Sequence, residues 1–306
     1  MHLNVVTTLR CNLRCAHCIY ACPAHGDLDP GRYAHVLDAL IPRGLRTLTL
    51  TGGEPSLHPG FDALVDEAAE RGLRFGIVSN AWNAGAYDAA VGKHRRQFTG
   101  FHFSLDGLEA THDRVRGAGS CARVLEAIAR WRDTPTPARG NLVLSDLNRG
   151  ELGAVVALCA AAGAAAIKLG AVIPVPRAPG VRLSPDARLS AAEEAPALAR
   201  AHGIPVEPAS SLLTPPTVEF CAVMTTSTLT LNEKGEITWC CDVPGSAAAL
   251  GTCAESADEV LARRTRTKHE IVLDRLMRLR NGGPTLEDRC CAYCHEFFGL
   301  GVGHGG

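Results

Sequence analysis

Cys11-Asn12-Leu13-Arg14-Cys15-Ala16-His17-Cys18 is the most informative stretch of this chain. It directly follows the apolar, β-branched run His2–Thr8, which predicts a strand that ends where the cysteine loop begins. A cubane iron–sulfur cluster normally takes four cysteine thiolates, so a tight group of three leaves one iron without a protein ligand. Such an iron is open to a substrate or a cofactor.

The same three cysteines would also suit a zinc knuckle, a disulfide pair with a spare thiol, or small buried residues. Zinc prefers a closed set of four tetrahedral ligands, and its usual sequence mark is two separated cysteine pairs rather than a trio. The spacing therefore favours an iron–sulfur site.

The charge balance and the cysteine count narrow the functional class. The 306 residues include 31 basic and 32 acidic side chains, for a formal net charge of −1. Non-specific phosphate binding needs a basic excess, so we expect no nucleic-acid or membrane-surface role. The thirteen cysteines are an odd number, and the chain begins without the features of an export signal. We therefore predict a cytoplasmic protein whose cysteines serve metal or redox chemistry.

Short apolar or β-branched runs alternate with amphipathic stretches over residues 2–202. The predicted strands are His2–Thr8, Arg46–Thr51, Arg74–Ser79, Thr99–Leu105, Asn141–Ser145 and Ala165–Ile173. The predicted helices lie around 32–41, 61–71, 84–94, 121–131, 151–162 and 187–202. Six strand-then-helix units predict an α/β fold with a parallel sheet, either curled into a barrel or doubly wound. In both forms the functional loops lie at the carboxyl ends of the strands, where the cysteine loop is placed.

The C-terminal part of the chain is organised differently. A proline-rich stretch at 205–216 predicts a boundary between a region 1–204 and a region 205–306. Beyond it, the runs 226–231 and 236–241 flank a polar turn that contains Gly235, which predicts a hairpin. Two helical stretches are predicted at about 256–264 and 268–280.

The cysteine loop resembles that of the radical S-adenosylmethionine (radical SAM) superfamily, whose Cys-x3-Cys-x2-Cys spacing it reproduces. Thr51-Gly52-Gly53-Glu54-Pro55, after the second predicted strand, is similar to the Gly-Gly-Glu motif of that family. The resemblance implies a partial (β/α)6 barrel with a small C-terminal α+β auxiliary domain. It also implies that SAM chelates the open iron of a [4Fe–4S] cluster, and that the reduced cluster cleaves SAM to a 5′-deoxyadenosyl radical.

Polar residues at the ends of the predicted strands are candidates for binding SAM. By the resemblance, the Gly-Gly-Glu motif would hold the amino group of SAM, and the ends of the third and fourth strands would lie near its ribose. The histidine before the third cysteine would pack near adenine, and Arg116 would face cofactor or substrate. Turn formation and helix capping explain strand-end residues of this kind equally well. The candidates are His17, Gly52, Gly53, Glu54, Ser79, Asn80, Ser104, Asp106 and Arg116; no catalytic residue is assigned.

A second group of cysteines lies in the C-terminal region. A closed set of four suits a structural zinc or a second [4Fe–4S] cluster. The stretch from Gly235 to Cys240 is similar to the Gly-x4-Cys element of SPASM and twitch auxiliary domains, and the short tail fits a single twitch-type cluster. Cys241 could replace Cys240, and Cys290 could replace Cys291; alternation along a strand would let only one of the first pair face the metal. The candidate ligands are Cys221, Cys240, Cys291 and Cys294.

The resemblance implies an enzyme that abstracts a substrate hydrogen and completes an oxidative modification, either a dehydrogenation or a cross-link. The auxiliary cluster would accept the remaining electron. We expect a ribosomally made peptide as substrate, with an aminocyclitol or sugar intermediate as the alternative. The electron donor would be a flavodoxin or a ferredoxin. The basic run 263–269 is either a solvated surface or a docking patch for this donor or for an acidic peptide.

A hypothesis of another class is a non-catalytic SAM-binding metalloprotein with a structural zinc tail. The intact three-cysteine loop weighs against it, because a scaffold gives no reason to keep an open iron.

Overall fold

A computed structural model of the chain describes residues 1–20, 24–173, 180–212, 222–225, 228–241, 243, 246–281 and 290–299. The strands in these residues are β1 (His2–Thr8), β2 (Thr47–Gly52), β3 (Arg74–Ser79), β4 (Phe98–Ser104), β5 (Arg139–Leu144), β6 (Ile167–Ala171), β7 (Val206–Pro208), β8 (Thr228–Leu231), β9 (Glu236–Thr238) and β10 (Ala249–Thr252). They form one sheet in the order β10-β9-β8-β1-β2-β3-β4-β5-β6-β7. Pairing is parallel from β8 to β7 and antiparallel among β8, β9 and β10.

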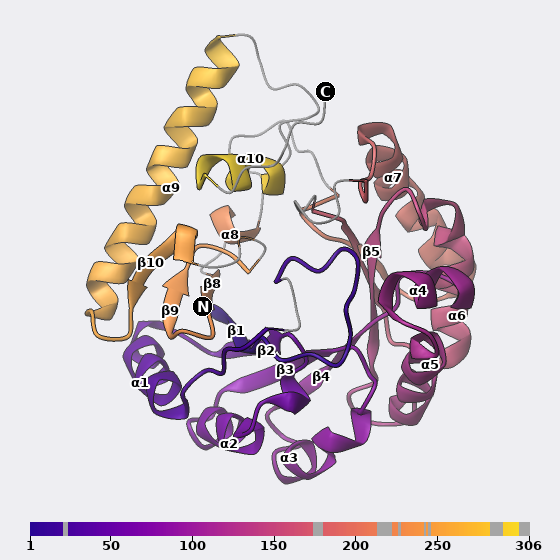
Figure 1. The fold of residues 1–306 in the computed structure, drawn as a ribbon, viewed down its shortest axis with the longest axis horizontal. Coiled ribbons are helices and arrows are strands. Elements are labelled where there is room, and N and C mark those ends of the chain that lie inside the picture. The colour runs from indigo at the N-terminus through magenta and orange to yellow at the C-terminus, as the bar shows by residue number, and fades with distance from the viewer. Residues whose placement is uncertain are drawn as a thin grey trace.

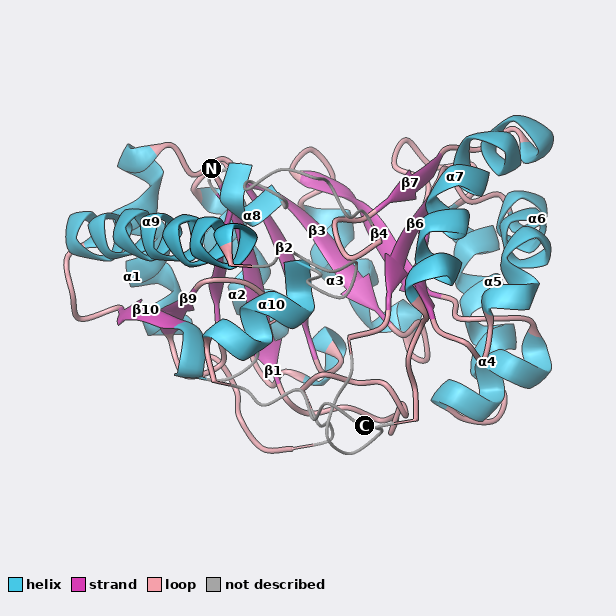
Figure 2. Cartoon of the chain, turned by 90° about the horizontal axis from the view of Figure 1, so that it is seen from above, coloured by secondary structure: helices cyan, strands magenta, loops and turns pink. Residues whose placement is uncertain are grey.

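Helices cover the outer side of this sheet and close part of its inner side. Figure 1 shows the sheet as an open arc with α1 to α7 around its outside, while α8 and α10 lie across the opening. Figure 2 shows the same arrangement from above, with α9 running along one side. The helices are α1 (Pro30–Leu40), α2 (Phe61–Glu70), α3 (Asp88–Lys93), α4 (Glu109–Arg116), α5 (Ser120–Trp131), α6 (Leu152–Ala162), α7 (Pro185–His202), α8 (Ala222–Thr225), α9 (Ala257–Arg280) and α10 (Cys290–Phe297).

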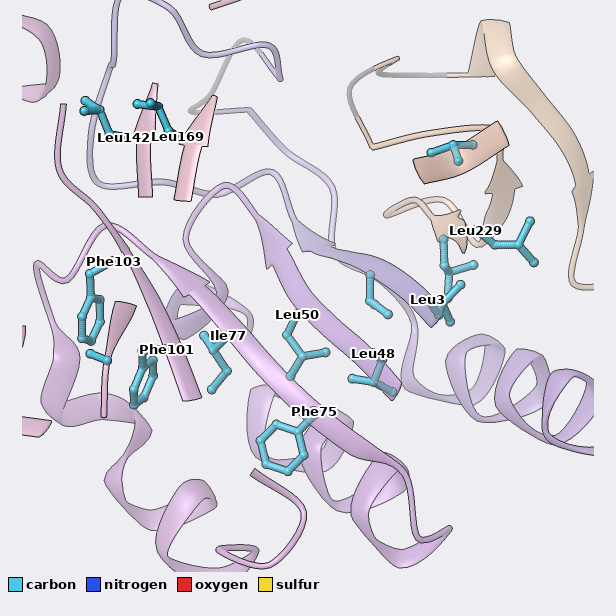
Figure 3. Close-up of a cluster of buried hydrophobic side chains, with 14 of the residues drawn as sticks. Leu3, Leu48, Leu50, Phe75, Ile77, Phe101, Phe103, Leu142, Leu169 and Leu229 are labelled. Atoms are coloured by element: carbon cyan, nitrogen blue, oxygen red, sulfur yellow. The ribbon is translucent and has the colours of Figure 1, made fainter. Parts of the chain in front are cut away.

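The main core fills the space between the outer face of the sheet and the helices. Alternate residues of a strand point to opposite faces, and the outward set is apolar and buried. Figure 3 shows these side chains, among them Leu3, Leu50, Phe75, Phe103 and Leu169, gathered on one side of the strands. The opposite, inward-facing positions are therefore left for polar groups and ligands.

The predicted α/β class with a parallel, open barrel-like sheet is confirmed. The six predicted strands correspond to β1 to β6. The prediction of two helices at 256–264 and 268–280 is wrong, because α9 is one helix of 24 residues. Its intervening residues contain no glycine or proline to end a helix, and the capping box at Ser256 marks only its start.

The sheet continues beyond the proline-rich stretch used to divide the chain. Val206, just after the predicted boundary, pairs with Ile167 of β6, and Thr228 of the C-terminal region pairs with His2 of β1. The C-terminal strands therefore extend the sheet from its other edge. The division at 204/205 stays a prediction. In the described part of the chain, every helix is too short or too polar to span a bilayer.

Candidate cofactor site at the cysteine loop

The cysteine loop leaves the carboxyl end of β1 and is fastened to α4. The Ala16 amide donates to the Val115 carbonyl at 3.0 Å, and the Cys18 amide donates to the Cys15 carbonyl at 3.3 Å. Cys11, Cys15 and Cys18 are not in disulfides, and their side chains are half-buried. The loop thus holds three reduced thiols beside the carboxyl end of β1.

Two N–H donors approach the thiols of this loop. Asn80 Nδ2 lies 3.8 Å from Cys11 Sγ, and Arg116 Nη1 lies 3.8 Å from Cys15 Sγ. Burial raises the pKa of Cys11 to about 11 and also raises the pKa of Cys15. Because metals bind the thiolate, metal binding must release protons here, and the two donors would then stabilise the sulfur charge.

Gly52 and Gly53 let the end of β2 pack against the backbone of the cysteine loop. A Cβ on Gly53 would lie 2.1 Å from the Arg10 carbonyl oxygen, and one on Gly52 would lie 2.4 Å from that of Thr8. The Gly53 amide donates to Thr8 O at 2.7 Å, and the Glu54 amide donates to Arg10 O at 2.8 Å. The Gly-Gly-Glu motif therefore fixes the position of the backbone that leads into Cys11.

Glu54 is buried and held by several protein donors. Its Oε1 accepts from the hydroxyls of Ser79 at 2.8 Å, Ser56 at 3.1 Å and Tyr87. Its Oε2 accepts from the Asn80 amide at 2.9 Å. Burial raises the pKa of Glu54, against the opposing effect of these hydrogen bonds. Glu54 therefore joins the ends of β2 and β3, and its contact with a ligand ammonium stays a prediction.

Asn80 connects the end of β3 to the cysteine loop. Its Nδ2 donates to Asn12 Oδ1 at 2.8 Å, and its Oδ1 accepts from the Trp82 amide at 2.9 Å. The Ser79 hydroxyl, which donates to Glu54, also accepts from the Ala81 amide at 3.0 Å. Ser79 and Asn80 thus position the turn beside Cys11, and their predicted contact with a ribose is untested.

Asp106 and Arg116 form an ion pair next to Cys15. Arg116 Nε donates to Asp106 Oδ2, and His17 Nε2 lies 3.3 Å from the same oxygen. Asp106 is fully buried, and its Oδ1 accepts from the Val143 amide at 2.8 Å. The structure brings these three candidates together with Cys15, and in this arrangement they contact one another.

Ser104 is the last residue of β4, and its side chain is buried. Its predicted contact with SAM ribose stays a prediction.

His112 supports the Asp106 turn from α4. Its Nδ1 accepts from the Asp106 amide at 2.9 Å, while its buried Nε2 has no partner among the described residues. Burial lowers the pKa of His112 to about 4. The folded protein therefore keeps this ring neutral at pH values where the unfolded chain protonates it.

The His112→Asn variant is expected to lose part of the acid sensitivity of folding. Between pH 6.5 and about 4 the unfolded state binds the extra proton, so the free energy of unfolding falls as the pH falls. One such group contributes at most about 1.4 kcal/mol per pH unit. Asparagine keeps an acceptor near Nδ1 but does not titrate. Denaturant unfolding of both proteins in the same cluster state, from pH 7 to pH 4, should give a shallower slope for the variant; parallel curves would contradict this role.

The candidate auxiliary ligands lie only partly within the described residues. Cys221 lies outside them, as do the side chains of Cys290 and Cys291 in α10. Cys240 is half-buried and Cys294 is buried. Within the described residues, no three His, Cys, Asp or Glu side chains gather closely enough to hold a single metal ion. In a cubane each thiolate binds a different iron, so this observation does not bear on whether Cys11, Cys15 and Cys18 could hold a cluster.

The segment after β9 contacts both β1 and the cysteine loop. The predicted strand 236–241 ends at Thr238, so strand alternation does not separate Cys240 from Cys241. Asn4 Nδ2 lies 3.7 Å from Cys241 Sγ, and the Tyr20 hydroxyl donates to the Cys241 carbonyl at 2.9 Å. Tyr20 was not singled out from the sequence, although its place two residues after Cys18 is a usable signal.

The residues around the loop fit an iron–sulfur cluster with an open iron. Three reduced thiols share one loop, and two N–H donors approach their sulfurs. Buried polar candidates such as Glu54 and Asp106 are satisfied by protein groups and hold the site in shape.

Comparison with known families agrees with this site. The family model described as the radical SAM superfamily matches residues 5–159, which include the cysteine loop and every predicted cofactor-binding residue. Sporulation killing factor maturation protein SkfB from Bacillus subtilis (strain 168) is 29% identical over 174 residues, or 56% of this chain and 42% of SkfB. An S-adenosylmethionine-dependent nucleotide dehydratase from Selenomonas ruminantium is 35% identical over 79 residues, or 26% of this chain and 29% of that protein. The chain thus spans less than half the length of these curated relatives.

Solved structures share the fold. The crystal structure of Streptococcus suis SuiB bound to S-adenosylmethionine has a TM-score of 0.71 at 15% identity, covering 85% of this chain and 65% of SuiB. SuiB bound to its precursor peptide SuiA has a TM-score of 0.64 at 13% identity, covering 78% of this chain and 59% of that one. At such low identity the likeness concerns the fold alone.

Proposed function

The chain belongs to the radical SAM superfamily, and from this premise we propose that it is an enzyme that oxidatively modifies a ribosomally made peptide. The observation that carries the proposal is the loop with three reduced thiols and the N–H donors beside Cys11 and Cys15. When bound there, a [4Fe–4S] cluster with SAM supplies a 5′-deoxyadenosyl radical for abstracting hydrogen from an unactivated carbon.

The residues of the chain have distinct tasks in this proposal. Cys11, Cys15 and Cys18 hold the cluster, and Asn80 and Arg116 stabilise the charge on its sulfur ligands. Ser104 offers its hydroxyl to SAM, and His17 lies beside the same site through its contact with Asp106. Glu54 and Asp106, buried and satisfied, keep the strand ends in register around the cluster.

The oxidative outcome rests on a second cluster in the tail. Abstracting a hydrogen atom from a carbon, and losing a proton from the adjacent atom or from the atom that forms the new bond, leaves one electron, which an auxiliary [4Fe–4S] cluster on Cys221, Cys240, Cys291 and Cys294 would accept. The contact between Tyr20 and Cys241 supports this assignment, since it joins the candidate auxiliary segment to the cysteine loop. Dehydrogenation and cross-link formation both satisfy this electron balance.

A peptide substrate is favoured by the relatives. SkfB is named as a maturation protein, and SuiB has been solved with a precursor peptide. Because another relative is named as a nucleotide dehydratase, a small-molecule substrate is the second candidate. The electron donor would be a flavodoxin or ferredoxin. Arg266 and His269 on the exposed side of α9 could contact it, whereas Arg263 is bonded to Glu255 at 2.7 Å.

The proposal is tested by anaerobic assay of the reconstituted enzyme with SAM, dithionite and peptides encoded beside its gene. We expect 5′-deoxyadenosine release and a peptide that has lost two hydrogen atoms by mass spectrometry. Release of 5′-deoxyadenosine with every peptide unchanged, and a modified sugar or nucleotide instead, would support the second candidate. Absence of 5′-deoxyadenosine from protein with full iron content would contradict the proposed enzyme.

Cys240 rather than Cys241 is expected to be the auxiliary ligand. The Cys241 thiol is turned to Asn4 on β1, and its backbone carbonyl is engaged by Tyr20. The Cys240→Ala variant should therefore lose about four irons per chain and Cys241→Ala none. Iron analysis of both variants against wild type checks this, and the reverse pattern would assign the ligand to Cys241.

A further inference from the structure

The inner wall of the sheet carries a row of polar side chains that the proposed cofactor site does not use. Register places Asn141 of β5 beside Lys168 of β6, and one step away His102 of β4 beside Arg139 of β5. The residues that follow them, Leu142 and Leu169, face the opposite way into the core (Figure 3). Asn141, Lys168 and His102 are therefore on the inward-facing side of the barrel wall.

The positive charge of Lys168 affects histidines on both sides of the barrel interior. His102 is half-buried, and burial followed by the charges of Lys168 and Arg139 lowers its pKa to about 4. Burial also lowers the pKa of His2 on β1, and the charge of Lys168 contributes to that shift. Since β2 to β5 separate β1 from β6 in the sheet, an ammonium that influences both histidines projects into the concave space.

The wall has an excess of positive charge at neutral pH. Glu207 of β7 is the register neighbour of Lys168, but its carboxylate pairs with Arg139 at 3.0 Å, and both histidines are neutral. Among the described inward-facing residues of β4 to β7, Arg139, Lys168 and Glu207 are the charged ones, so this wall carries a net positive charge. Asn4 and Thr49, across the barrel on β1 and β2, are uncharged.

The inner wall is also connected to the cysteine loop through hydrogen bonds. Two residues beyond Asn141, the Val143 amide donates to Asp106, and Asp106 holds Arg116 beside Cys15. A group anchored at Lys168 and Asn141 would therefore lie on the same strands as the cofactor site, further into the barrel.

The geometry points to a substrate carboxylate site on this wall, with Lys168 as the charge partner, Asn141 as the amide donor and His102 as a neutral neighbour. It rests on the proposed function, because it assigns the substrate of that enzyme: a peptide that presents an acidic group to the barrel interior. An ammonium and an amide beside a partly desolvated ring favour a carboxylate over a neutral amide of the same shape.

The test measures binding of three short probes to the reconstituted, SAM-loaded protein by ligand-observed NMR at low salt. The probes are acetyl-Gly-Glu-Gly-amide, its isosteric glutamine version, and acetyl-Gly-Gly-Gly with a free carboxyl terminus. We expect a carboxylate probe to bind about tenfold more tightly than the glutamine probe, a difference of about 1.4 kcal/mol. Which carboxylate probe binds distinguishes a side chain from a chain terminus as the source.

Substitutions of Lys168 test whether this side chain causes the preference for a carboxylate. Lys168→Met should abolish the preference and Lys168→Arg should retain it. The matched control is Lys93→Met, which removes an outer lysine paired with Asp66 at 2.8 Å and should leave the preference intact. No preference in wild type, or the same preference in Lys168→Met, would overturn the site. Release of 5′-deoxyadenosine from the same samples reports on the proposed function separately, since it needs no probe binding.

Discussion

Alanine at position 53 is expected to destroy the iron site of the cysteine loop. The new Cβ would lie 2.1 Å from the Arg10 carbonyl oxygen and 2.8 Å from its carbon, so backbone has to move. That movement breaks the Gly53–Thr8 and Glu54–Arg10 hydrogen bonds and displaces Cys11, the next residue in the loop. Overpacking typically costs about 1–3 kcal/mol, and this backbone clash is expected at the upper end of that range. Iron analysis should show a loss of about four irons per chain.

Gly92→Ala is the matched control for this substitution. Gly92 lies in α3, and a Cβ there meets no atom within 4 Å. Alanine should keep the full iron content and stabilise the helix by roughly 0.5–1 kcal/mol. A Gly53→Ala protein with the iron content and unfolding midpoint of wild type would show that β2 does not position the loop.

Methionine in place of Arg116 is expected to destabilise the protein and lower the reduction potential of the loop cluster. It leaves the buried Asp106 carboxylate without its cation, which costs about 3–5 kcal/mol. It also removes an N–H donor and a positive charge 3.8 Å from Cys15 Sγ, so the more negative reduced state is less stabilised. A tenfold fall in the ratio of reduced to oxidised cluster would correspond to about 59 mV.

Two further variants separate the effects on stability and potential. Asp106→Asn combined with Arg116→Met removes the unpaired charge, so stability should partly recover while the potential stays low. Arg116→Lys keeps the charge and should stay closer to wild type in potential. Denaturant unfolding and a redox titration followed by electron paramagnetic resonance measure the two quantities. A wild-type potential in Arg116→Met would mean that this side chain does not act on the cluster.

The fold could be predicted from local pattern where the pattern was strong. The six strands β1 to β6 are apolar, β-branched runs bounded by turns, and all were found. The three-residue β7 contains Pro208 and is too short for a periodic signal, and α4 is too polar to stand out. The continuity of α9 was missed although its central residues contain no glycine or proline, because the threonines there have weak helix propensity.

The sequence supplies the list of candidate site residues but not their contacts with one another. The cysteine spacing and the Gly-Gly-Glu motif are local in sequence. The ion pair between Asp106 and Arg116, and the burial of Glu54 under Ser79 and Tyr87, depend on the meeting of separate strands and helices. Several side chains that the sequence suggests for cofactor binding therefore have protein partners that only the three-dimensional structure reveals.

The most direct test of the central claim is the iron and sulfide content of anaerobically reconstituted protein, with Cys11, Cys15 and Cys18 all intact or all replaced by alanine. If the loop holds one cluster and the tail another, wild type should bind about eight irons per chain and the triple variant about four. Electron paramagnetic resonance of the wild type should change on adding SAM, and that of the variant should not. A triple variant that keeps all the iron of the wild type would contradict the assignment of this loop as the open cluster site.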